Sequence, residues 1–433
     1  MKSRSMLVFA SFLALVSASS AFAQGRFIRV TNSSSNPDGT EFYGPTMMRP
    51  SLSADGTRLL YTMFSSKNDI HAQSVQMDTI ALTNPPTLVR GAHIEFPTGA
   101  PAGANVYLST QPSMSASGSV VATTPVYQSK TGEFRDNLKI FSIGSDNVPQ
   151  ILFEKSGEEV DSISSVRVSA NGRFVAYVVV EYLEEQGEKS TVFTYDVQSK
   201  TEKAVWSNVT EFGNVGVKGI SDDGTRVLLG SAYESEPTGG NLSVLNVSTG
   251  AVTMVTDIKE EQKAPNSGSW DGNGVMAAFA ASAPLVKGDT NRALDVYLAS
   301  TAKSNSVPML RISALGSKQG NYSSGQPDIS RNGRFVAFIS RADNLRQNDA
   351  NYVKDLYVYS LNRGTLSSFV AGNEDIDAPT VNDSGAVVAF VSSASDITPN
   401  DTVGTKDIFV GVPSPLRPGS VGGVSKAFKG LEE

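Results

Sequence analysis

The sequence of 433 residues contains no cysteine, two histidines and two tryptophans. Without cysteine no disulfide can hold the fold, so a hydrophobic core must stabilise it. The histidines, His71 and His93, are too few for a histidine-rich metal site, and we expect them to be ordinary surface or core residues. After residue 23 no run is long and apolar enough to cross a membrane.

The N-terminus has the pattern of a secretory signal. A basic start (residues 1–4) precedes an apolar run (6–16) and an Ala-x-Ala site (21–23). This predicts a signal peptide over residues 1–23, and the lack of cysteine excludes a lipoprotein anchor. Cleavage removes two basic residues, so the formal net charge goes from −7 to −9. We therefore expect a periplasmic or secreted protein that neither inserts into a membrane nor favours nucleic acid.

One pattern recurs seven times along the chain, and PDISRNGRFVAFIS from Pro327 is a representative copy. A short strand leads into an Asp-Gly or Asn-Gly pair, which favours a tight turn because these residues tolerate positive φ. The apolar run that follows is typical of a strand covered on both faces. The marker glycines are Gly56, Gly118, Gly172, Gly224, Gly274, Gly333 and Gly385. Their spacing of 50 to 62 residues is in the range of propeller blades.

Two more strand-like runs follow each copy, such as DLYVYSL from Asp355 and MLRIS from Met309. Four strands per repeat form a propeller blade. The sequence therefore predicts an all-β, seven-bladed β-propeller of four-stranded antiparallel blades over residues 24–412. The alternative is two separate β domains, which the unbroken series of repeats disfavours.

The seventh repeat has no fourth strand of its own. Residues 26–31, RFIRVT, match the fourth-strand pattern, most clearly that of 309–313. We predict that they pair with residues 407–412 and close the ring, which removes exposed strand edges. Residues 413–433 have the composition of a flexible C-terminal tail, although 424–431 could form a short amphipathic helix.

The P-x-x-S-x-D-G-R-x-V-A-F element, with a later D-[IVL]-[YF]-V strand, resembles the propeller repeat of the periplasmic protein TolB. The resemblance covers nearly all of the chain after residue 23 and implies the fold, but not a role, since the same repeat serves unrelated proteins. TolB carries an α/β domain before a six-bladed propeller. Here only about twenty residues separate the predicted cleavage site from the first repeat region. The chain therefore looks like a stand-alone relative, and TolB's partners are not carried over.

The loops between the second and third strands of repeats five to seven suggest a metal. D-x-N-x3-D occurs twice and D-x5-D once, and oxygen ligands with this spacing are what Ca²⁺ prefers. These loops also resemble the calcium loops of related propellers. The alternative is that Asp and Asn only bend surface turns. The candidate ligands are Asp289, Asn291, Asp295, Asp349, Asn351, Asp355, Asp401 and Asp407.

No local motif indicates an enzyme. The sequence contains no G-x-S-x-G elbow, H-E-x-x-H motif, P-loop or dinucleotide fingerprint. Two carboxylates from different blades could still meet at the channel mouth and hydrolyse a polysaccharide. Trp270, just before a tight turn, could stack on a sugar or peptide there or simply pack.

These observations favour a monomeric, non-enzymatic binding or scaffold protein of the cell envelope. It would present a propeller face to a protein or glycan, with calcium stiffening some loops. The alternative is an extracellular carbohydrate-active enzyme that uses carboxylates at the channel mouth.

Overall fold

The computed structural model describes residues 27–31, 41–45, 49–67, 70–83, 86–94, 104–155, 162–183, 187–210, 215–231, 240–259, 265, 267–302, 309–347, 349–370, 372–399, 406–412 and 416–420. These segments are β-strands joined by turns, with no helix among them. The part of the chain described thus includes no helix of the length and hydrophobicity that a membrane span requires. The predicted signal peptide, residues 1–23, lies outside the described residues.

The turn after the first strand of each repeat is closed by the same hydrogen bond. The side-chain oxygen of its first residue accepts the backbone N–H of the residue five positions later, as Ser53 does from Arg58 at 2.9 Å. The fourth residue is the marker glycine, whose φ lies between +69° and +77° in all seven repeats, a region that other residues rarely adopt. The accepting side chains are Ser53, Ser115, Ser169, Ser221, Asp271, Ser330 and Asn382.

Six repeats form four-stranded antiparallel blades, which we number by repeat. Blade two contains β8 (Ser113–Met114), β9 (Val120–Thr123), β12 (Leu138–Ile143) and β13 (Pro149–Lys155). Blade three contains β14 (Ser162–Val168), β15 (Phe174–Leu183), β16 (Gly187–Asp196) and β17 (Thr201–Thr210). Blade four contains β18 (Val215–Ile220), β19 (Arg226–Ser231), β20 (Ser243–Asn246) and β21 (Val252–Met254).

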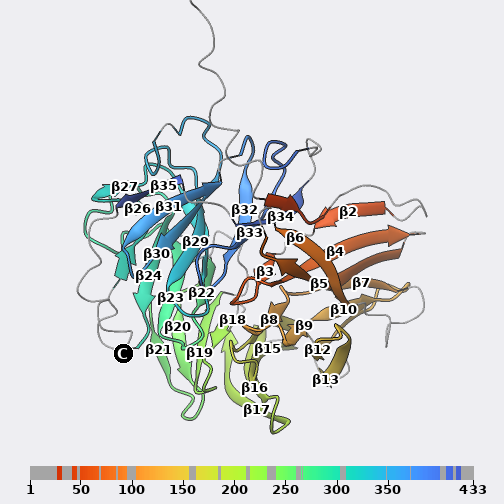
Figure 1. The fold of residues 1–433 in the computed structure, drawn as a ribbon. Helices are drawn as coiled ribbons and strands as arrows, with labels where there is room; N and C mark the ends of the chain where they lie inside the picture. The colour runs from red at the N-terminus through yellow and green to blue at the C-terminus, as the bar shows by residue number, and fades with distance from the viewer. Residues whose placement is uncertain are drawn as a thin grey trace, which may run out of the picture.

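Blade five contains β22 (Ser267–Trp270), β23 (Met276–Ala281), β24 (Asp295–Ser300) and β25 (Met309–Arg311), and a small hairpin of β26 (Ala314–Leu315) and β27 (Lys318–Gln319) follows it. Blade six contains β28 (Ser324–Ile329), β29 (Phe335–Ser340), β30 (Asp355–Ser360) and β31 (Thr365–Val370). Blade seven contains β32 (Ile376–Val381), β33 (Val388–Ser392), β34 (Asp407–Gly411) and β1 (Phe27–Arg29). Figure 1 shows these sheets following one another around the molecule.

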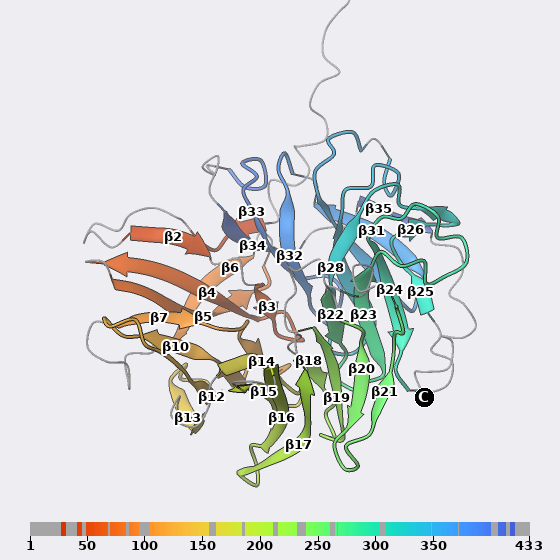
Figure 2. The same cartoon turned by 180° about the vertical axis from the view of Figure 1, so that it is seen from behind.

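The middle strands of the blades are covered on both faces, as their apolar sequences predict. Every residue of β23, β24 and β30 is buried. Neighbouring blades pack through these residues, so that the hydrophobic core consists of separate clusters between sheets rather than one central mass. The short first strands line the middle of the molecule, where β3 (Ser51–Leu52), β14, β18, β22, β28 and β32 come together (Figure 2).

Repeat one departs from the four-stranded pattern. Its strands belong to an eight-stranded sheet of β2 (Glu41–Pro45), β3, β4 (Arg58–Lys67), β5 (Ile70–Ala81), β6 (Thr87–Ile94), β7 (Asn105–Leu108), β10 (Pro125–Gln128) and β11 (Phe134–Asp136). With 10 and 12 residues, β4 and β5 extend outward beyond β3 and β6. Their outer halves pair with β2 and, in parallel, with β7.

A switch of sheets at Pro125 completes this arrangement. β9 ends at Thr123 within blade two, whereas β10 begins at Pro125 and pairs with β7. Proline cannot donate to a central ladder, so the chain leaves blade two at this position. The prediction of seven four-stranded blades is therefore wrong. The described residues form six blades with this four-stranded core, one of which gains a fifth strand, and one eight-stranded sheet that contains the first repeat.

The marker turns of all seven repeats are joined into a closed ring by hydrogen bonds. The backbone bonds run from Ala54 to Ala116, Ala116 to Ala170, Asp222 to Gly272, Gly272 to Arg331 and Asp383 to Ala54, at 2.7 to 2.9 Å. At the two remaining junctions an asparagine and an aspartate pair through backbone and side chain, Asn171 with Asp222 and Asn332 with Asp383, at 2.7 to 3.0 Å. Because a Cβ on Gly272 would lie 2.8 Å from that of Ala170, this junction requires glycine.

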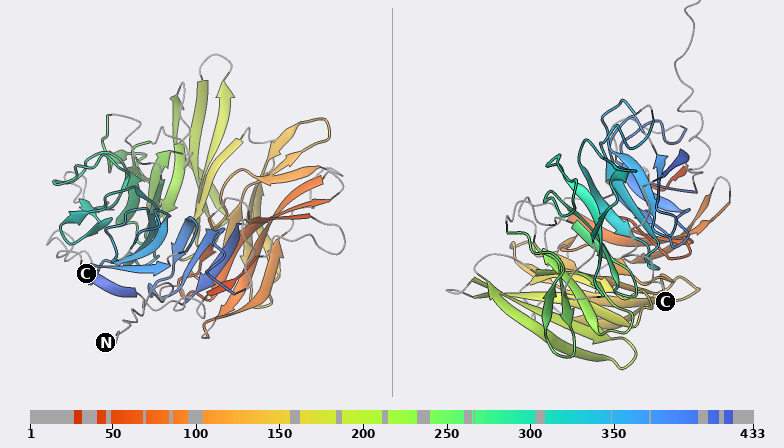
Figure 3. Two further views of the ribbon diagram at one scale, coloured as in Figure 1. Left: turned by 90° about the horizontal axis from the view of Figure 1, so that it is seen from above. Right: turned by 90° about the vertical axis from the view of Figure 1, so that its left-hand side faces the viewer.

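The N-terminal strand closes the outer part of the ring. β1 pairs antiparallel with β34, with Phe27 opposite Gly411 and Arg29 opposite Phe409, which is the pairing predicted for residues 26–31 and 407–412. A core cluster that includes Tyr61 packs the eight-stranded sheet against blade seven. The views in Figure 3 show the sheets from above and from the side.

Part of the expected flexible tail is ordered into a strand. β35 (Leu416–Ser420) pairs antiparallel with β31 and makes blade six five-stranded. The remaining residues of the tail, including 424–431, lie outside the described part of the chain.

Asp271 should make the stability of the propeller pH-dependent. It replaces the usual serine of the turn, and burial raises its pKa to about 6 although it accepts N–H bonds from Met276 and Val275. Because this pKa lies above the unfolded value of 3.8, the carboxyl favours folding at low pH, and this contribution is lost as the pH rises from about 4 to about 6.

We expect the free energy of unfolding of the wild type, relative to Asp271→Asn, to fall by up to about 3 kcal/mol between pH 4 and pH 7. Asparagine keeps the acceptor and cannot ionise. Urea denaturation across this range measures the difference, with exposed Asp146→Asn as the control for loss of a charge. Parallel pH profiles for wild type and Asp271→Asn would contradict the prediction.

Candidate functional site

The structure brings together the two aspartates of each candidate loop in blades five and six. Asp289 and Asp295 have side-chain exposures of 4% and 0%, and Asp349 and Asp355 have the same values. In each blade the second aspartate is the first residue of the third strand, β24 or β30. Asp401 lies outside the described residues, so only Asp407 can be placed in blade seven.

In blade five every oxygen of both carboxylates accepts a hydrogen bond. Gln319 Nε2 donates to Asp289 Oδ1 and to Asp295 Oδ2, both at 2.7 Å. Ser313 Oγ donates to Asp295 Oδ1 at 2.5 Å, and the Tyr297 hydroxyl donates to Asp289 Oδ2. Arg311 Nη1 also lies 3.6 Å from Asp289 and 3.9 Å from Asp295.

In blade six the cation is Arg346. Its Nε and Nη2 donate to Asp355 Oδ2 at 3.0 and 2.8 Å, and Nη2 lies 3.0 Å from Asp349 Oδ1. Burial raises the pKa of Asp355 to about 7, the nearby Asp349 adds to the rise, and Arg346 opposes it. Burial also raises the pKa of Tyr357, with Asp355 and Asp349 contributing.

The asparagines of the motif are not aimed at the carboxylates. Asn291 Nδ2 donates to Gly320 O at 2.6 Å, and Asn351 Nδ2 donates to Gly372 O at 3.0 Å. In both cases the amide oxygen accepts a backbone N–H of its own loop. The asparagines thus tie each loop to the connection between neighbouring blades.

In blade seven Asp407 is also fully buried and has two partners from the N-terminal strand. Thr31 Oγ1 donates to Asp407 Oδ1 at 2.9 Å and accepts the N–H of Ile408 at 2.9 Å. Arg29 Nη1 lies 3.8 Å from Asp407 Oδ2.

This arrangement does not fit calcium in blade five. Ca²⁺ needs six to eight oxygen ligands, and here the carboxylate oxygens already accept from serine, tyrosine and glutamine, with the Arg311 guanidinium 3.6 to 3.9 Å away. No group of three or more His, Asp or Glu side chains suited to a metal occurs among the described residues. Calcium binding remains a prediction, and the hydrogen bonds give these residues a structural role instead.

A second candidate site is a small cavity of about 70 Å³ at the centre of the molecule, open to solvent. It is lined by first strands and the residues next to them from repeats one to seven. The charged residues that line it are Arg49, Arg167, Lys218, Asp328 and Arg331. Four are basic and one is acidic, although the chain as a whole is acidic.

Two of these arginines also donate hydrogen bonds that join different repeats around the cavity. Arg331 Nη2 donates to Met114 O at 3.0 Å, which joins blade six to blade two across the ring. Arg49 Nη1 donates to Pro327 O at 2.8 Å and lies 3.9 Å from Asp328 Oδ1. Both guanidinium groups are therefore fixed in position with their charge beside the cavity.

The sequence alone does not identify these four cations. They lie in or beside first strands, but the repeat spacing does not show which side chains point inward. A possible signal is a basic residue close to the marker turn, as Arg167, Lys218 and Arg331 are.

Neither the histidines nor Trp270 form a separate site. His93 lies in β6 rather than in a loop, and its Nδ1 is 2.8 Å from Gln76 Oε1. His71 lies in β5. Trp270 borders the cavity but is 3% exposed, and its Nε1 donates to Thr301 Oγ1 at 3.0 Å, so it mainly packs.

Comparisons with known proteins extend only to the fold. Prolyl oligopeptidase B from Galerina marginata is 12% identical with a TM-score of 0.51, over 82% of this chain and 47% of that one. Oligogalacturonate lyase from Vibrio parahaemolyticus is 12% identical (TM-score 0.48; 90% of this chain, 98% of that one). TolB from Acinetobacter baumannii is 13% identical (TM-score 0.38; 74% and 82%). No family model and no curated protein matches the sequence.

The resemblance to TolB-type repeats thus holds at the level of a β-propeller fold. A propeller fold by itself does not choose between binding and catalysis, because function depends on the site that the fold carries.

Ser313→Ala should destabilise blade five measurably. Its hydroxyl donates to the buried Asp295 and accepts the N–H of Val296 at 3.1 Å, so its removal leaves two buried polar groups unpaired. We expect a loss of about 1–3 kcal/mol in the free energy of unfolding, measured by urea denaturation. Ser317→Ala, a nearby exposed serine, is the matched control. Equal stability of the two variants would be inconsistent with this role.

Proposed function

We propose that this protein is a non-enzymatic binding protein of the cell envelope that holds an acidic group of its partner in the central cavity. The observation that carries the proposal is the set of four basic side chains around this cavity in an otherwise acidic protein. The N-terminal signal pattern supports a periplasmic or secreted location.

The position of the cations supports a specific anion site. Arg167 and Lys218 come from the adjacent first strands β14 and β18, and Arg49 and Arg331 come from repeats one and six. Lys218 is 7% exposed, so its charge lies within the molecule rather than on an outer surface. A carboxylate entering such a partly desolvated cavity would form charge-assisted hydrogen bonds, which are stronger than neutral ones.

The alternative, a carbohydrate-active enzyme with two catalytic carboxylates, has weaker support. Glycoside hydrolysis generally needs two carboxyl groups within about 5–10 Å of each other. Among the described residues that line the cavity, Asp328 is the single carboxylate, and it lies 3.9 Å from Arg49.

Replacing two of the cations should weaken binding of acidic polymers. We expect wild-type protein to bind polygalacturonate or polyglutamate and not neutral dextran, with affinity that falls as salt is added. Arg167→Gln with Lys218→Gln should reduce this affinity at least about tenfold in titration calorimetry. The polymer that binds identifies the partner as a glycan or a protein.

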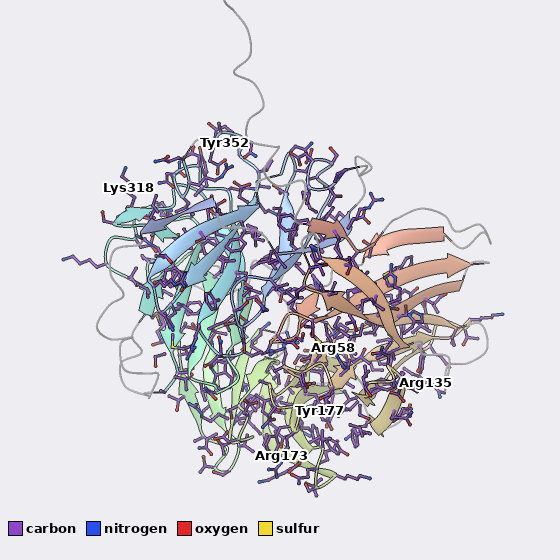
Figure 4. All side chains as sticks on the ribbon, in the orientation of Figure 1. Arg58, Arg135, Arg173, Tyr177, Lys318 and Tyr352 are labelled. Atoms are coloured by element: carbon purple, nitrogen blue, oxygen red, sulfur yellow. The ribbon has the colours of Figure 1, made fainter. Side chains whose placement is uncertain are left out.

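The matched control is Lys318→Gln, an exposed lysine at the periphery of the molecule (Figure 4). It should leave the affinity unchanged. Binding of neither polymer, or equal binding by the cavity and control variants, would refute the proposal. Release of new sugar ends from polygalacturonate would favour the enzyme.

A further inference from the structure

The third strands of blades five, six and seven all begin with a buried aspartate that faces an arginine. Asp295, Asp355 and Asp407 each have a side-chain exposure of 0%. Their distances to an arginine guanidinium nitrogen are 3.9, 2.8 and 3.8 Å. A carboxylate this deeply buried requires a compensating charge or a raised pKa.

The arginine comes from two different places in the chain. In blades five and seven it comes from the fourth strand, where Arg311 pairs with Tyr297 and Arg29 pairs with Phe409. In blade six this fourth-strand position is Ser368, which pairs with Tyr357.

The missing arginine of blade six is supplied by the loop. Arg346 lies three residues before the first aspartate of the motif, a position held by Val286 in blade five and Thr398 in blade seven. Each of blades five to seven therefore has a single arginine, either at the fourth-strand position or at the loop position. This exchange indicates that the requirement is for one positive charge beside the aspartate, not for a particular strand residue.

A hydroxyl two residues after the fourth-strand arginine completes the arrangement in blades five and seven. Ser313 and Thr31 each donate to the aspartate and accept the N–H of the residue that follows it. The resemblance between the sequences MLRIS and FIRVT thus reflects a shared Arg-x-Ser/Thr carboxylate clamp.

We propose that in blades five and six an arginine takes the place that a divalent cation would have in these aspartate loops, so that the loops need no metal. The guanidinium supplies the positive charge. In blade six Arg346 donates directly to Asp355, whereas in blade five Arg311 donates to Gly288 O and places its charge 3.6 and 3.9 Å from Asp289 and Asp295. In blade five, removal of Arg311 leaves the two carboxylates without a neighbouring positive charge, so that Ca²⁺ can then compete with Gln319, Ser313 and Tyr297 for their oxygens.

Arg311→Met tests this proposal, because methionine fills similar space without charge. Thermal unfolding of the full chain is measured in calcium chloride and in EGTA. We expect the wild-type melting temperature to be the same in both. For Arg311→Met in EGTA we expect a fall of at least about 5 °C, because two buried carboxylates lose the positive charge beside them. Calcium should restore part of this loss.

Two further variants keep the test decisive. Arg363→Met, at an exposed arginine, should behave as wild type in both solutions. If Arg311→Met does not fold, the double variant Asp289→Asn with Arg311→Met is measured instead. It removes one carboxylate charge, so it should be more stable than the single variant in EGTA. Calcium should not change its melting temperature.

Three results would overturn the proposal. The first is a wild-type melting temperature that drops in EGTA, which would restore calcium as the native partner. The second is Arg311→Met as stable as wild type in EGTA. The third is a destabilised Arg311→Met that calcium does not rescue, or a double variant no more stable than the single one.

Discussion

The rest of the structure depends on the ring of hydrogen bonds between the marker turns. Each turn has buried backbone groups that its own blade cannot satisfy, and the next turn supplies the partner. Because the ring passes through the turn of repeat one as well as those of the six blades, it fixes the first strands around one centre. The eight-stranded sheet can therefore diverge in its outer part without opening the ring.

The turns at the centre are closed in the same way in every repeat, whereas the outer strands differ. The departures from the four-stranded blade pattern therefore lie at the outer edges. At the centre, Gly272 is required because its neighbours leave no room for a Cβ. At the periphery, Pro125 lets the second strand of repeat two change sheets, and β35 adds to the edge of blade six. Outer strands have free edges, and a neighbouring segment can pair with them.

The buried charged groups form two separate sets, one within blades five to seven and one around the central cavity. Aspartates at the start of the third strands are neutralised within their own blades by Arg311, Arg346 or Arg29. The cations of the central cavity come instead from several repeats, so their combined charge is concentrated at the centre. Arg331 takes part both in the hydrogen-bonded ring and in the cavity. Its carbonyl accepts a hydrogen bond of the ring, and its guanidinium donates to Met114 O across the ring.

The sequence by itself determined the repeat unit. The turn glycines, the apolar middle strands and the match of Arg26 to Thr31 with a fourth strand are local patterns with a period, and the pairing of Phe27 with Gly411 follows from them. Tertiary structure alone decided which residues meet across repeats. Periodicity does not reveal that Gln319 bridges Asp289 and Asp295, or that Arg49 and Arg331 face one cavity, because their separation in sequence carries no signal. It also could not show that repeat one merges into a larger sheet, since strand pairing beyond the blade depends on which free edges the folded ring brings together.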